Sequence, residues 1–456
     1  MNNGNPTYSL ITYGCQMNEH DSEILAGILQ EMGYRKARAP EEADLILLNT
    51  CCVRESAERK VYGKIGELKR LKHRRPDLII GVCGCMTQQK DLARRMSRRA
   101  PHVDLIIGTH NLHELPRLLE EVKECRGEPR VEVWESEGEV VENLPAVREE
   151  GVRAWVTIMY GCNNYCAYCI VPYVRGRERS RRPEDITREV EELGRRGFKE
   201  VTLLGQNVNA YGRDLGGDMD FADLLARLDT VPGVERIRYT TSHPRDFNQK
   251  MIDVVSESRK VCEHFHLPVQ AGSNETLRLM NRGYTREHYL ELTAAIQSRI
   301  PGASITTDII VGFPGETEEQ FEETLDLVRR VEFDNAFTFM YSPRSGTAAA
   351  RMPEQLPLPV KKERLQRLME VQYPITRRKN EALVGETVEV LVEGPSKANP
   401  ARLTGRTRTN RIVLLPGDAA RAGEMVMVEI TSARTWTLEG RVKTRRSRQS
   451  VTSPAG

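Results

Sequence analysis

Short apolar runs and longer amphipathic stretches alternate along the first 125 residues. Four of the apolar runs predict strands: Tyr8–Tyr13, Leu45–Leu48, Leu78–Val82 and Val103–Ile107. The stretches between them have the length and apolar spacing of helices. Because strands that alternate with helices form a parallel sheet covered on both faces, we expect a doubly wound domain over residues 1–127. Residues 128–150 predict a linker with one short strand at most.

The same alternation returns between residues 151 and 376. Six runs predict strands there: Trp155–Met159, Glu200–Leu204, Arg236–Tyr239, Phe265–Pro268, Ile305–Val311 and Asn335–Tyr341. Helical stretches such as Pro183–Arg196 and Glu318–Val331 separate them. About six strand–helix units in one domain predict a partial or full parallel barrel.

The pattern changes again after residue 376, to short alternating runs interrupted by Gly and Pro. Three of these runs predict strands: Thr387–Val392, Arg411–Leu415 and Glu424–Ile430. A small antiparallel β-barrel over residues 377–445 fits this texture. A basic tail follows over 446–456. The predicted fold is therefore α/β and multidomain, with a doubly wound sheet, a (β/α) barrel and a small β-barrel in that order.

Composition narrows the class of protein. The chain has 456 residues, 39% of them hydrophobic, and no apolar run long enough to span a bilayer. Its first residues lack the features of a secretory signal, so we expect a cytoplasmic protein. Ten cysteines in a reducing compartment favour metal ligands, catalytic thiols or core residues over disulfides.

The formal net charge of +2 conceals local excesses of basic residues. They lie in Arg54–Arg75, in Arg175–Arg182 and from Arg377 to the end of the chain. Each segment alone is equally consistent with a solvated face. Together they indicate a polyanionic partner such as a nucleic acid.

Three cysteines lie within eight residues directly after a predicted strand: Cys162, Cys166 and Cys169. A zinc site usually has four protein ligands, and no fourth Cys or His lies in this loop. Three thiolates on a four-iron cluster leave one iron without a protein ligand, and that iron is then able to bind a small molecule. The alternative is three unrelated core cysteines.

This loop, with Tyr168 before its last cysteine, resembles the motif of the radical S-adenosylmethionine (SAM) superfamily. The resemblance implies a [4Fe–4S] cluster whose open iron binds SAM and whose electron cleaves it to a 5′-deoxyadenosyl radical. It also implies cofactor contacts from Tyr168, from Gly205 and Gln206 after the second barrel strand, and from Gly312 after the fifth.

Three further cysteines follow the first three predicted strands: Cys15, Cys51 and Cys85. The carboxyl ends of parallel strands lie at one edge of a sheet, so these thiols should converge, close to helix N-termini that stabilise thiolates. We expect a second cluster there, with buried structural thiols or redox sensing as alternatives. Strand spacing favours Cys51 over Cys52 and Cys85 over Cys83 as ligands, because side chains one residue apart point in different directions.

Nearly the whole chain resembles the methylthiotransferase family. The motifs that carry the resemblance are Gly14-Cys15-Gln16-Met17-Asn18, Asn49-Thr50-Cys51, Gly84-Cys85-Met86, Leu267-Pro268-Val269-Gln270 and Tyr341-Ser342-Pro343-Arg344. The resemblance implies two [4Fe–4S] clusters and a C-terminal RNA-binding barrel called TRAM. It also implies two uses of SAM: one methylates a sulfur on the N-terminal (auxiliary) cluster, and the other supplies the radical.

Within that family, Asn163-Asn164, Ile170-Val171-Pro172-Tyr173 and Arg175-Gly176-Arg177 are most similar to the bacterial members that act on isopentenyl-adenosine beside the tRNA anticodon. The implied partners are the tRNA anticodon stem-loop and an electron donor such as flavodoxin or ferredoxin, and we expect a monomer. Relatives that modify threonylcarbamoyl-adenosine or a ribosomal-protein aspartate remain alternatives. So does a non-catalytic iron–sulfur protein that binds RNA.

Two further interpretations concern single residues. In the C-terminal barrel, four arginines are candidate phosphate contacts or solvated positions: Arg402, Arg406, Arg408 and Arg411. His243 and His266 lie near barrel strand ends, and we interpret both as hydrogen-bonded structural residues.

Overall fold

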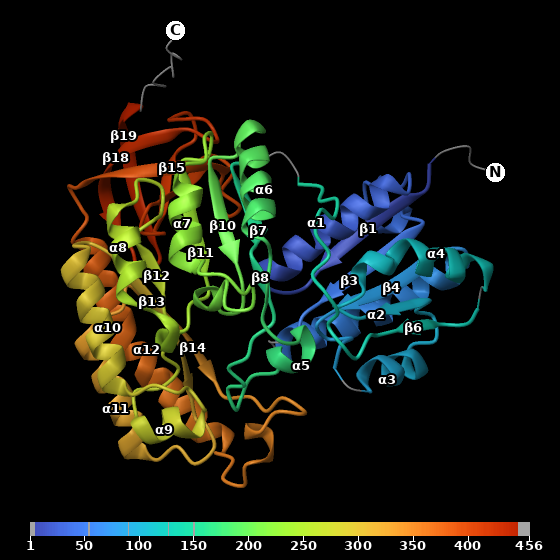
Figure 1. Ribbon diagram of the computed structural model, residues 1–456, viewed down its shortest axis with the longest axis horizontal. Coiled ribbons are helices and arrows are strands. Elements are labelled where there is room, and N and C mark those ends of the chain that lie inside the picture. Colours follow the sequence, from blue (N-terminus) through green and yellow to red (C-terminus); the bar gives the residue numbers. More distant parts are fainter. Residues whose placement is uncertain (1–4, 53–54, 90, 126, 149–150, 446–456) are drawn as a thin grey trace.

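The computed structural model describes residues 5–52, 55–89, 91–125, 127–148 and 151–445 (Figure 1). The predicted tail over 446–456 and the pair Val53-Arg54 lie outside the described residues. No helix in the described part of the chain has both the length and the apolarity needed to cross a membrane.

The N-terminal domain is a six-stranded, entirely parallel sheet in the order β2-β1-β3-β4-β5-β6. Its strands are β1 (Thr7–Thr12), β2 (Arg35–Lys36), β3 (Leu45–Thr50), β4 (Ile79–Gly84), β5 (Leu105–Ile107) and β6 (Arg130–Glu132). The four predicted strands are all present. The short strand expected in the linker is β6, which pairs with β5 and extends the sheet beyond residue 127.

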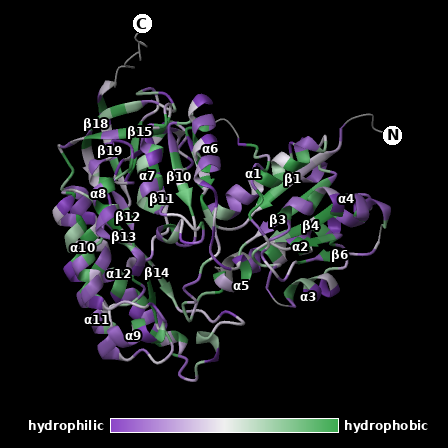
Figure 2. Ribbon diagram, in the orientation of Figure 1, coloured by the Kyte–Doolittle hydropathy of each residue, from purple (hydrophilic) through white to green (hydrophobic). Residues whose placement is uncertain are grey.

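Helices cover both faces of this sheet, as a doubly wound fold requires. Helices α1 (Gln16–Glu31) and α4 (Leu115–Glu124) pack on one face, and α2 (Glu55–Arg74) and α3 (Leu92–Arg99) pack on the other. Figure 2 shows hydrophobic strands at the centre of the domain and hydrophilic residues on its helices. The carboxyl edge of the sheet, where the predicted cysteines lie, faces the central domain (Figure 1).

The central domain is a partial barrel of two parallel three-stranded sheets, β11-β10-β7 and β12-β13-β14, joined by a bridge between Ile237 and Val261. Its strands are β7 (Arg153–Thr157), β10 (Glu200–Leu204), β11 (Arg236–Thr240), β12 (His264–His266), β13 (Ser304–Val311) and β14 (Asn335–Met340). The outer helices are α6 (Pro183–Arg195), α7 (Phe221–Asp229), α8 (Gln249–Glu257), α10 (Arg286–Arg299), α11 (Glu318–Val331) and α12 (Leu358–Glu381).

Shorter elements complete the connections of the central domain. They are the pair β8 (Met159–Tyr160) and β9 (Arg179–Ser180), helix α5 (Val171–Arg175) and helix α9 (Asn274–Leu279). Single 3₁₀ turns lie at Pro40–Glu42, Leu112–Glu114, Val208–Ala210, Pro244–Asp246 and Ala349–Arg351. Six βα units therefore form the partial barrel that the sequence pattern predicts.

The C-terminal domain is a closed five-stranded barrel in the order β15-β16-β17-β19-β18. Its strands are β15 (Thr387–Pro395), β16 (Arg402–Thr407), β17 (Ile412–Pro416), β18 (Met425–Ala433) and β19 (Thr437–Arg445). Neighbouring strands are antiparallel except β17 and β19, which are parallel and close the barrel. Sequence analysis did not identify β16 and β19, because arginines and threonines occupy many of their positions. Helix α12 crosses the predicted boundary at residue 376 and ends at Glu381.

The small barrel is docked on the amino ends of the central strands (Figure 1). Along β11, Ile237 and Tyr239 pack under the outer helices, so Arg236 and Arg238 face the other side. The guanidinium of Arg236 donates to the Arg406 carbonyl at 2.7 Å, and that of Arg238 donates to the Arg408 carbonyl at 2.8 Å. The C-terminal domain thus closes the amino end of the partial barrel and leaves the carboxyl end for chemistry.

Substituting Arg236→Met should destabilise this interface strongly. Arg236 is fully buried, and its guanidinium is 3.0 Å from a Glu389 carboxylate oxygen. Removing the guanidinium leaves the Arg406 carbonyl and the partly buried Glu389 carboxylate without their partner, which costs about 1–3 kcal/mol. Thermal unfolding followed by circular dichroism should show an earlier first transition. The control Arg434→Met, whose side chain is 77% exposed, should unfold like the parent protein; equal transitions in both variants would contradict the prediction.

Candidate functional site

The loop that carries Cys162, Cys166 and Cys169 leads from β8 to α5, between the central and N-terminal domains (Figure 1). Cys162 and Cys166 are buried, and the Cys169 amide donates to the Cys166 carbonyl at 2.9 Å. Burial raises the pKa of Cys162 to about 11, and burial together with the neighbouring thiol of Cys166 raises the pKa of Cys169 to about 12. The fold thus gathers the three thiols in one loop, and those of Cys162 and Cys169 ionise readily only when a cation binds them.

A buried arginine lies against this loop and was not identified from the sequence. One nitrogen of the Arg282 guanidinium lies 3.3 Å from the Cys166 sulfur and 3.4 Å from the Tyr168 hydroxyl. The second terminal nitrogen of the same guanidinium donates to the Pro268 carbonyl at 2.6 Å. Arg282 is 4% exposed, so its charge acts on the loop with little screening by water. A fixed positive charge at this point suits an anionic thiolate cluster.

The predicted SAM contacts lie where the barrel strands end. Gly205 directly follows β10, and a β-carbon there would lie 2.7 Å from Cγ of Met159, so only glycine fits. The backbone at Gly312, after β13, has φ +70°, and its amide donates to the Glu316 carboxylate at 2.7 Å. Arg364 in turn holds Glu316 at 2.7 Å. Both strand ends therefore present rigid backbone at the open end of the barrel.

Five of the buried polar atoms that have no hydrogen-bond partner among the described residues lie at the same end of the barrel. They lie just beyond β10, β11, β12 and β14, in Gln206 (Oε1), Ser242 (Oγ), His243 (Nε2), Gln270 (Oε1) and Tyr341 (hydroxyl). A polar ligand such as SAM at this end would supply the partners that these five atoms lack. Of the five residues, sequence analysis assigned only Gln206 to a ligand; Gln270 and Tyr341 lie in motifs that it quoted for the family.

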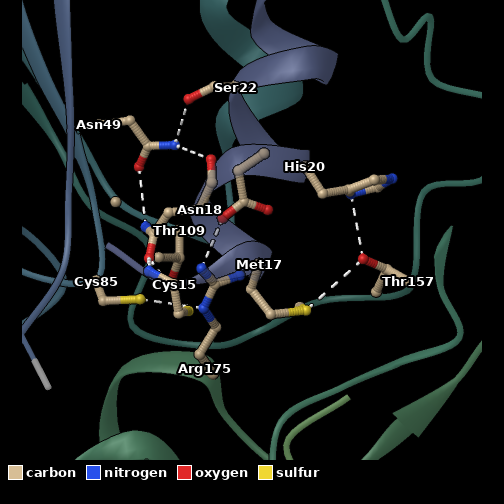
Figure 3. A network of polar contacts seen from close by, with 12 residues as sticks. Cys15, Met17, Asn18, His20, Ser22, Asn49, Cys85, Thr109, Thr157 and Arg175 are labelled. Carbon is tan, nitrogen blue, oxygen red and sulfur yellow. Dashed lines mark hydrogen bonds and ion pairs between the residues drawn. The ribbon is translucent and has the colours of Figure 1, made fainter. Parts of the chain in front are cut away.

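The N-terminal thiols occupy the carboxyl edge of the sheet, as predicted. Cys51 and Cys85 directly follow β3 and β4, and Cys15 is the N-cap of α1. Asparagines join the loops: the Asn18 amide donates to the Asn49 oxygen at 3.1 Å, and the Asn49 amide donates to the Ser22 hydroxyl at 2.9 Å (Figure 3). These bonds fix the backbone that presents the thiols.

The N-terminal thiols also interact with one another. Hydrogen bonding to Cys51 lowers the pKa of Cys15 to about 6, against the effect of burial, and the charge of Arg175 contributes. Hydrogen bonding to Cys52 likewise lowers the pKa of Cys85. Cys83 lies within β4 and packs in the core beneath α1 and α4 instead. The structure therefore brings Cys52 to the edge of the site together with the three predicted ligands.

Both thiol groups consist of soft sulfur donors, which are the ligands of iron–sulfur clusters. Among the described residues, no group of three or more Cys, His, Asp or Glu is arranged to hold one ion. A single ion would need all its sulfurs within about 2.3 Å of one point. In a four-iron cluster each thiolate binds a different iron, so the ligand sulfurs lie farther apart. Soft sulfur donors, rather than imidazole or carboxylate, are the ligands such a cluster requires.

The structure corrects the interpretation of two basic segments. Arg175 and Arg181 are buried and paired with Asp21 and Glu189, so these two arginines belong to an internal network, whereas Arg177 and Arg182 of the same segment are exposed. The four candidate phosphate contacts of the C-terminal barrel are paired as well, in Arg402–Glu439, Arg406–Glu393, Arg408–Glu263 and Arg411–Asp334. The last two pairs join domains, which no local sequence pattern reveals.

The two histidines behave largely as expected. His266 shares a hydrogen bond of 3.1 Å with the Thr306 hydroxyl. His243 accepts from the Arg245 amide through Nδ1, and burial lowers its pKa to about 2. Its Nε2 is one of the unpaired atoms at the barrel mouth. His266 Nε2 also lies 3.6 Å from a carboxylate oxygen of Asp308.

The partial barrel, the three-cysteine loop and the polar strand ends together define a radical SAM protein. The radical SAM superfamily matches residues 156–328, the uncharacterised protein family UPF0004 matches 7–108, and the TRAM domain matches 381–443. The chain is 62% identical to a protein of Moorella thermoacetica over 434 residues, which are 95% of this chain and 98% of that one. It is 58% identical to a protein of Desulforamulus reducens, over 96% of each chain. Both relatives are named tRNA-2-methylthio-N(6)-dimethylallyladenosine synthase.

The chain therefore belongs to the family of tRNA-2-methylthio-N(6)-dimethylallyladenosine synthases, which are radical SAM enzymes. Its cofactors are SAM and two [4Fe–4S] clusters. Among solved structures, the radical SAM methyltransferase TsrM of Kitasatospora setae is similar at a TM-score of 0.54 and 15% identity. That match covers 76% of this chain and 77% of TsrM, and it supports the fold alone.

Proposed function

We propose that this protein converts N6-(dimethylallyl)adenosine, next to the tRNA anticodon, into its 2-methylthio derivative. The observation that carries the proposal is the placement of two all-cysteine sites at one domain interface. One site lies at the carboxyl edge of the N-terminal sheet and the other at the carboxyl end of the partial barrel. The reaction replaces the C2–H bond of adenine by a C2–S bond, and that hydrogen is too weakly acidic for ordinary acid–base catalysis. When bound, the clusters supply the electron that cleaves SAM and the sulfur that is methylated and transferred.

Each set of residues has a part in this chemistry. Cys162, Cys166 and Cys169 hold the cluster at which SAM is cleaved, and Arg282 supports their charge. The open strand ends with Tyr168, Gly205, Gln206 and Gly312 hold SAM. The set Cys15, Cys51 and Cys85 holds the auxiliary cluster. An adenosine in the anticodon loop is single-stranded, so it can be splayed out of its stack and placed between the two sites.

The decisive experiment supplies the reconstituted protein with SAM, a reductant and a choice of substrates. An anticodon stem-loop that contains dimethylallyl-adenosine should yield the 2-methylthio nucleoside by mass spectrometry. A stem-loop with threonylcarbamoyl-adenosine, or a ribosomal protein that contains the target aspartate, should yield none. Product from either substrate alone would identify the protein as the corresponding relative. Absence of 5′-deoxyadenosine with all three would favour a non-catalytic iron–sulfur protein.

The cellular context belongs to the same proposal. A tRNA substrate and two oxygen-sensitive clusters suit the cytoplasm, where a low-potential donor such as flavodoxin or ferredoxin supplies electrons. We propose a monomer, because one chain contains both cysteine sets. Mass spectrometry of tRNA nucleosides from cells that lack the protein should show dimethylallyl-adenosine in place of its methylthio derivative.

We further propose that helices α2 and α3 bind the phosphates of the tRNA. The basic segment on α2 has several exposed cations, and α3 adds more beside it. The exposed residues are Lys60, Lys69, Arg70, Arg94, Arg95, Arg98 and Arg99. Tyr62, which is 41% exposed, lies among them close enough to sense Arg95 and Arg99. Cations around an exposed aromatic ring are typical of RNA-binding surfaces.

The double substitution Arg98→Glu with Arg99→Glu should weaken tRNA binding by about tenfold or more. The slope of the logarithm of the binding constant against the logarithm of the salt concentration should also become shallower by about two, because two phosphate contacts no longer release a counterion each. Arg329→Glu with Arg330→Glu is a matched control, since both pairs occupy the last turn of an exposed helix and change the net charge equally. Filter binding at several salt concentrations measures both effects, and equal losses in the two variants would contradict this surface.

A further inference from the structure

One short segment connects the two cysteine sites. Cys169 is the last cysteine of the radical SAM loop, and α5 begins two residues later at Val171 and ends at Arg175. The guanidinium of Arg175 donates from Nε to the Cys85 sulfur at 3.1 Å. Figure 3 shows Arg175 pointing from this segment toward Cys85 and Cys15. Only five residues of chain therefore separate Cys169, a predicted ligand of one cluster, from Arg175, which contacts a predicted ligand of the other.

The N-terminal domain holds this segment at several points. Arg175 pairs with Asp21 at 2.6 Å, and both side chains are about 5% exposed. Ile170 and Val174 pack against Cys52 and Cys85. The Thr109 hydroxyl also donates to the Val174 carbonyl at 2.6 Å. Apolar contact, an ion pair and a backbone hydrogen bond together leave α5 little freedom to move relative to the N-terminal sheet.

Arg282 offers an instructive comparison. It too is buried and contacts a ligand sulfur, that of Cys166, but its other partners, Tyr168 and Pro268, lie in the same domain. Arg175 instead joins two domains, since its partners Asp21 and Cys85 precede it by 154 and 90 residues. A buried guanidinium requires partners for its charge, and these two lie at the auxiliary site. Arg282 and Arg175 thus both place a positive charge beside a cluster site. Only Arg175 also fixes the radical SAM loop relative to the auxiliary site.

We propose that Ile170–Arg175 is a strut that sets the spacing between the two cluster sites, and that Arg175 is the positioning residue that orients the Cys85 sulfur. The assignment rests on the proposed function. Methylthio transfer requires the sulfur and the substrate carbon to lie in contact, and a misplacement of about 1 Å costs about 100-fold in rate. A hydrogen bond to a ligand sulfur also stabilises the reduced cluster and so raises its reduction potential.

Three variants test the strut. Arg175→Met keeps the length of the side chain and removes its donors, and Arg175→Lys keeps the charge but cannot reach both partners. Thr109→Val removes the hydrogen bond to the Val174 carbonyl and leaves Arg175 itself unchanged. Arg177→Met is the control, because Arg177 is exposed and lies two residues further along the same loop. The reduction potential of the auxiliary cluster is measured in a background with Cys162, Cys166 and Cys169 replaced by alanine.

We expect Arg175→Met to keep the auxiliary iron, to lower the potential of that cluster and to speed hydrogen exchange of residues 170–175 in the apoprotein. In the otherwise intact enzyme, the ratio of methylthio product to 5′-deoxyadenosine should fall by about tenfold or more. Arg175→Lys should restore part of both values. Thr109→Val should speed exchange and lower the product ratio while the potential stays unchanged.

An unchanged potential and product ratio in Arg175→Met would overturn the role of Arg175. Parent-like exchange and product ratio in Thr109→Val would overturn the strut, including when Arg175→Met does not fold. If the proposed function itself is wrong, the parent protein forms no methylthio product. The potential and the hydrogen exchange would still report on the contact between Arg175 and Cys85, so the two failures are distinguishable.

Discussion

Replacing Cys162, Cys166 and Cys169 together by alanine is expected to abolish 5′-deoxyadenosine formation and methylthio transfer completely. SAM cleavage needs an iron that protein leaves open, and these three thiols are the only cysteines on the mouth of the partial barrel in the described chain. The protein should still fold, because the loop is fixed by backbone bonds such as that from the Ala167 amide to the Met280 carbonyl. Chromatography of the nucleoside products measures the effect.

The iron content of the same variant shows which of the two clusters is lost. The parent protein should hold about eight irons per chain and the triple variant about four, since only the auxiliary cluster remains. Cys262→Ala is a suitable control, because Cys262 is buried in the same domain but lies at the amino end of the barrel, near Arg238. SAM cleavage that persists in the triple variant would refute the assignment of the radical site.

The second large effect is expected from Cys51→Ala and from Cys85→Ala, each of which should lose the auxiliary cluster and all methylthio transfer. Both residues directly follow a strand, so their thiols lie at the edge of the sheet beside Cys15. A shift of the ligand by one residue turns its side chain away, and iron–sulfur bonds of about 2.3 Å do not bridge the difference. Iron should fall to about four per chain while 5′-deoxyadenosine formation continues.

The neighbouring cysteines provide matched controls for this series. Cys83→Ala changes a thiol that packs in the core of the N-terminal sheet, so iron content and activity should stay within a few-fold. Cys52→Ala removes a thiol that lies against Cys85, Ile170 and Val174, and the same outcome is expected from strand geometry. Because Cys52 reaches the site, it is the more demanding control. Loss of iron in Cys52→Ala with retention in Cys51→Ala would reverse the assignment.

The TRAM barrel also needs a different experiment from the one its basic composition suggests. Deleting residues from 380 onward would expose Arg236 and Glu200, which are both fully buried at the amino end of the central barrel. Weaker tRNA binding after such a deletion would then combine lost RNA contacts with damage to the central domain. Charge reversals on the exposed faces of helices avoid this problem. The adjacent arginines Arg98 and Arg99 of α3 are therefore the better probe of RNA binding, with Arg329 and Arg330 of α11 as the control.

Local sequence information was sufficient for much of this protein. Strand positions such as Glu200–Leu204 match the structure because a parallel strand buried on both faces reads as a short apolar run. Helix positions such as Glu318–Val331 match because burial of one helix face imposes a period of 3.6 residues. The cysteine loop at 162–169 was identifiable because a cluster needs its thiols within a short, defined spacing. Even the convergence of Cys15, Cys51 and Cys85 follows from strand order in a parallel sheet.

Only the tertiary structure decided which arginines are exposed to solvent and which are held in ion pairs inside the protein. Arg175, Arg181 and Arg408 have the sequence surroundings of surface cations, yet each is paired with a carboxylate, that of Asp21, Glu189 and Glu263 respectively. The contact from Arg175 to Cys85 and the unpaired polar atoms at the barrel mouth were equally invisible in the sequence. Periodicity and motif spacing report on neighbours along the chain, whereas the partner of a buried charge is chosen by the packing of distant elements, 154 residues apart for Arg175 and Asp21.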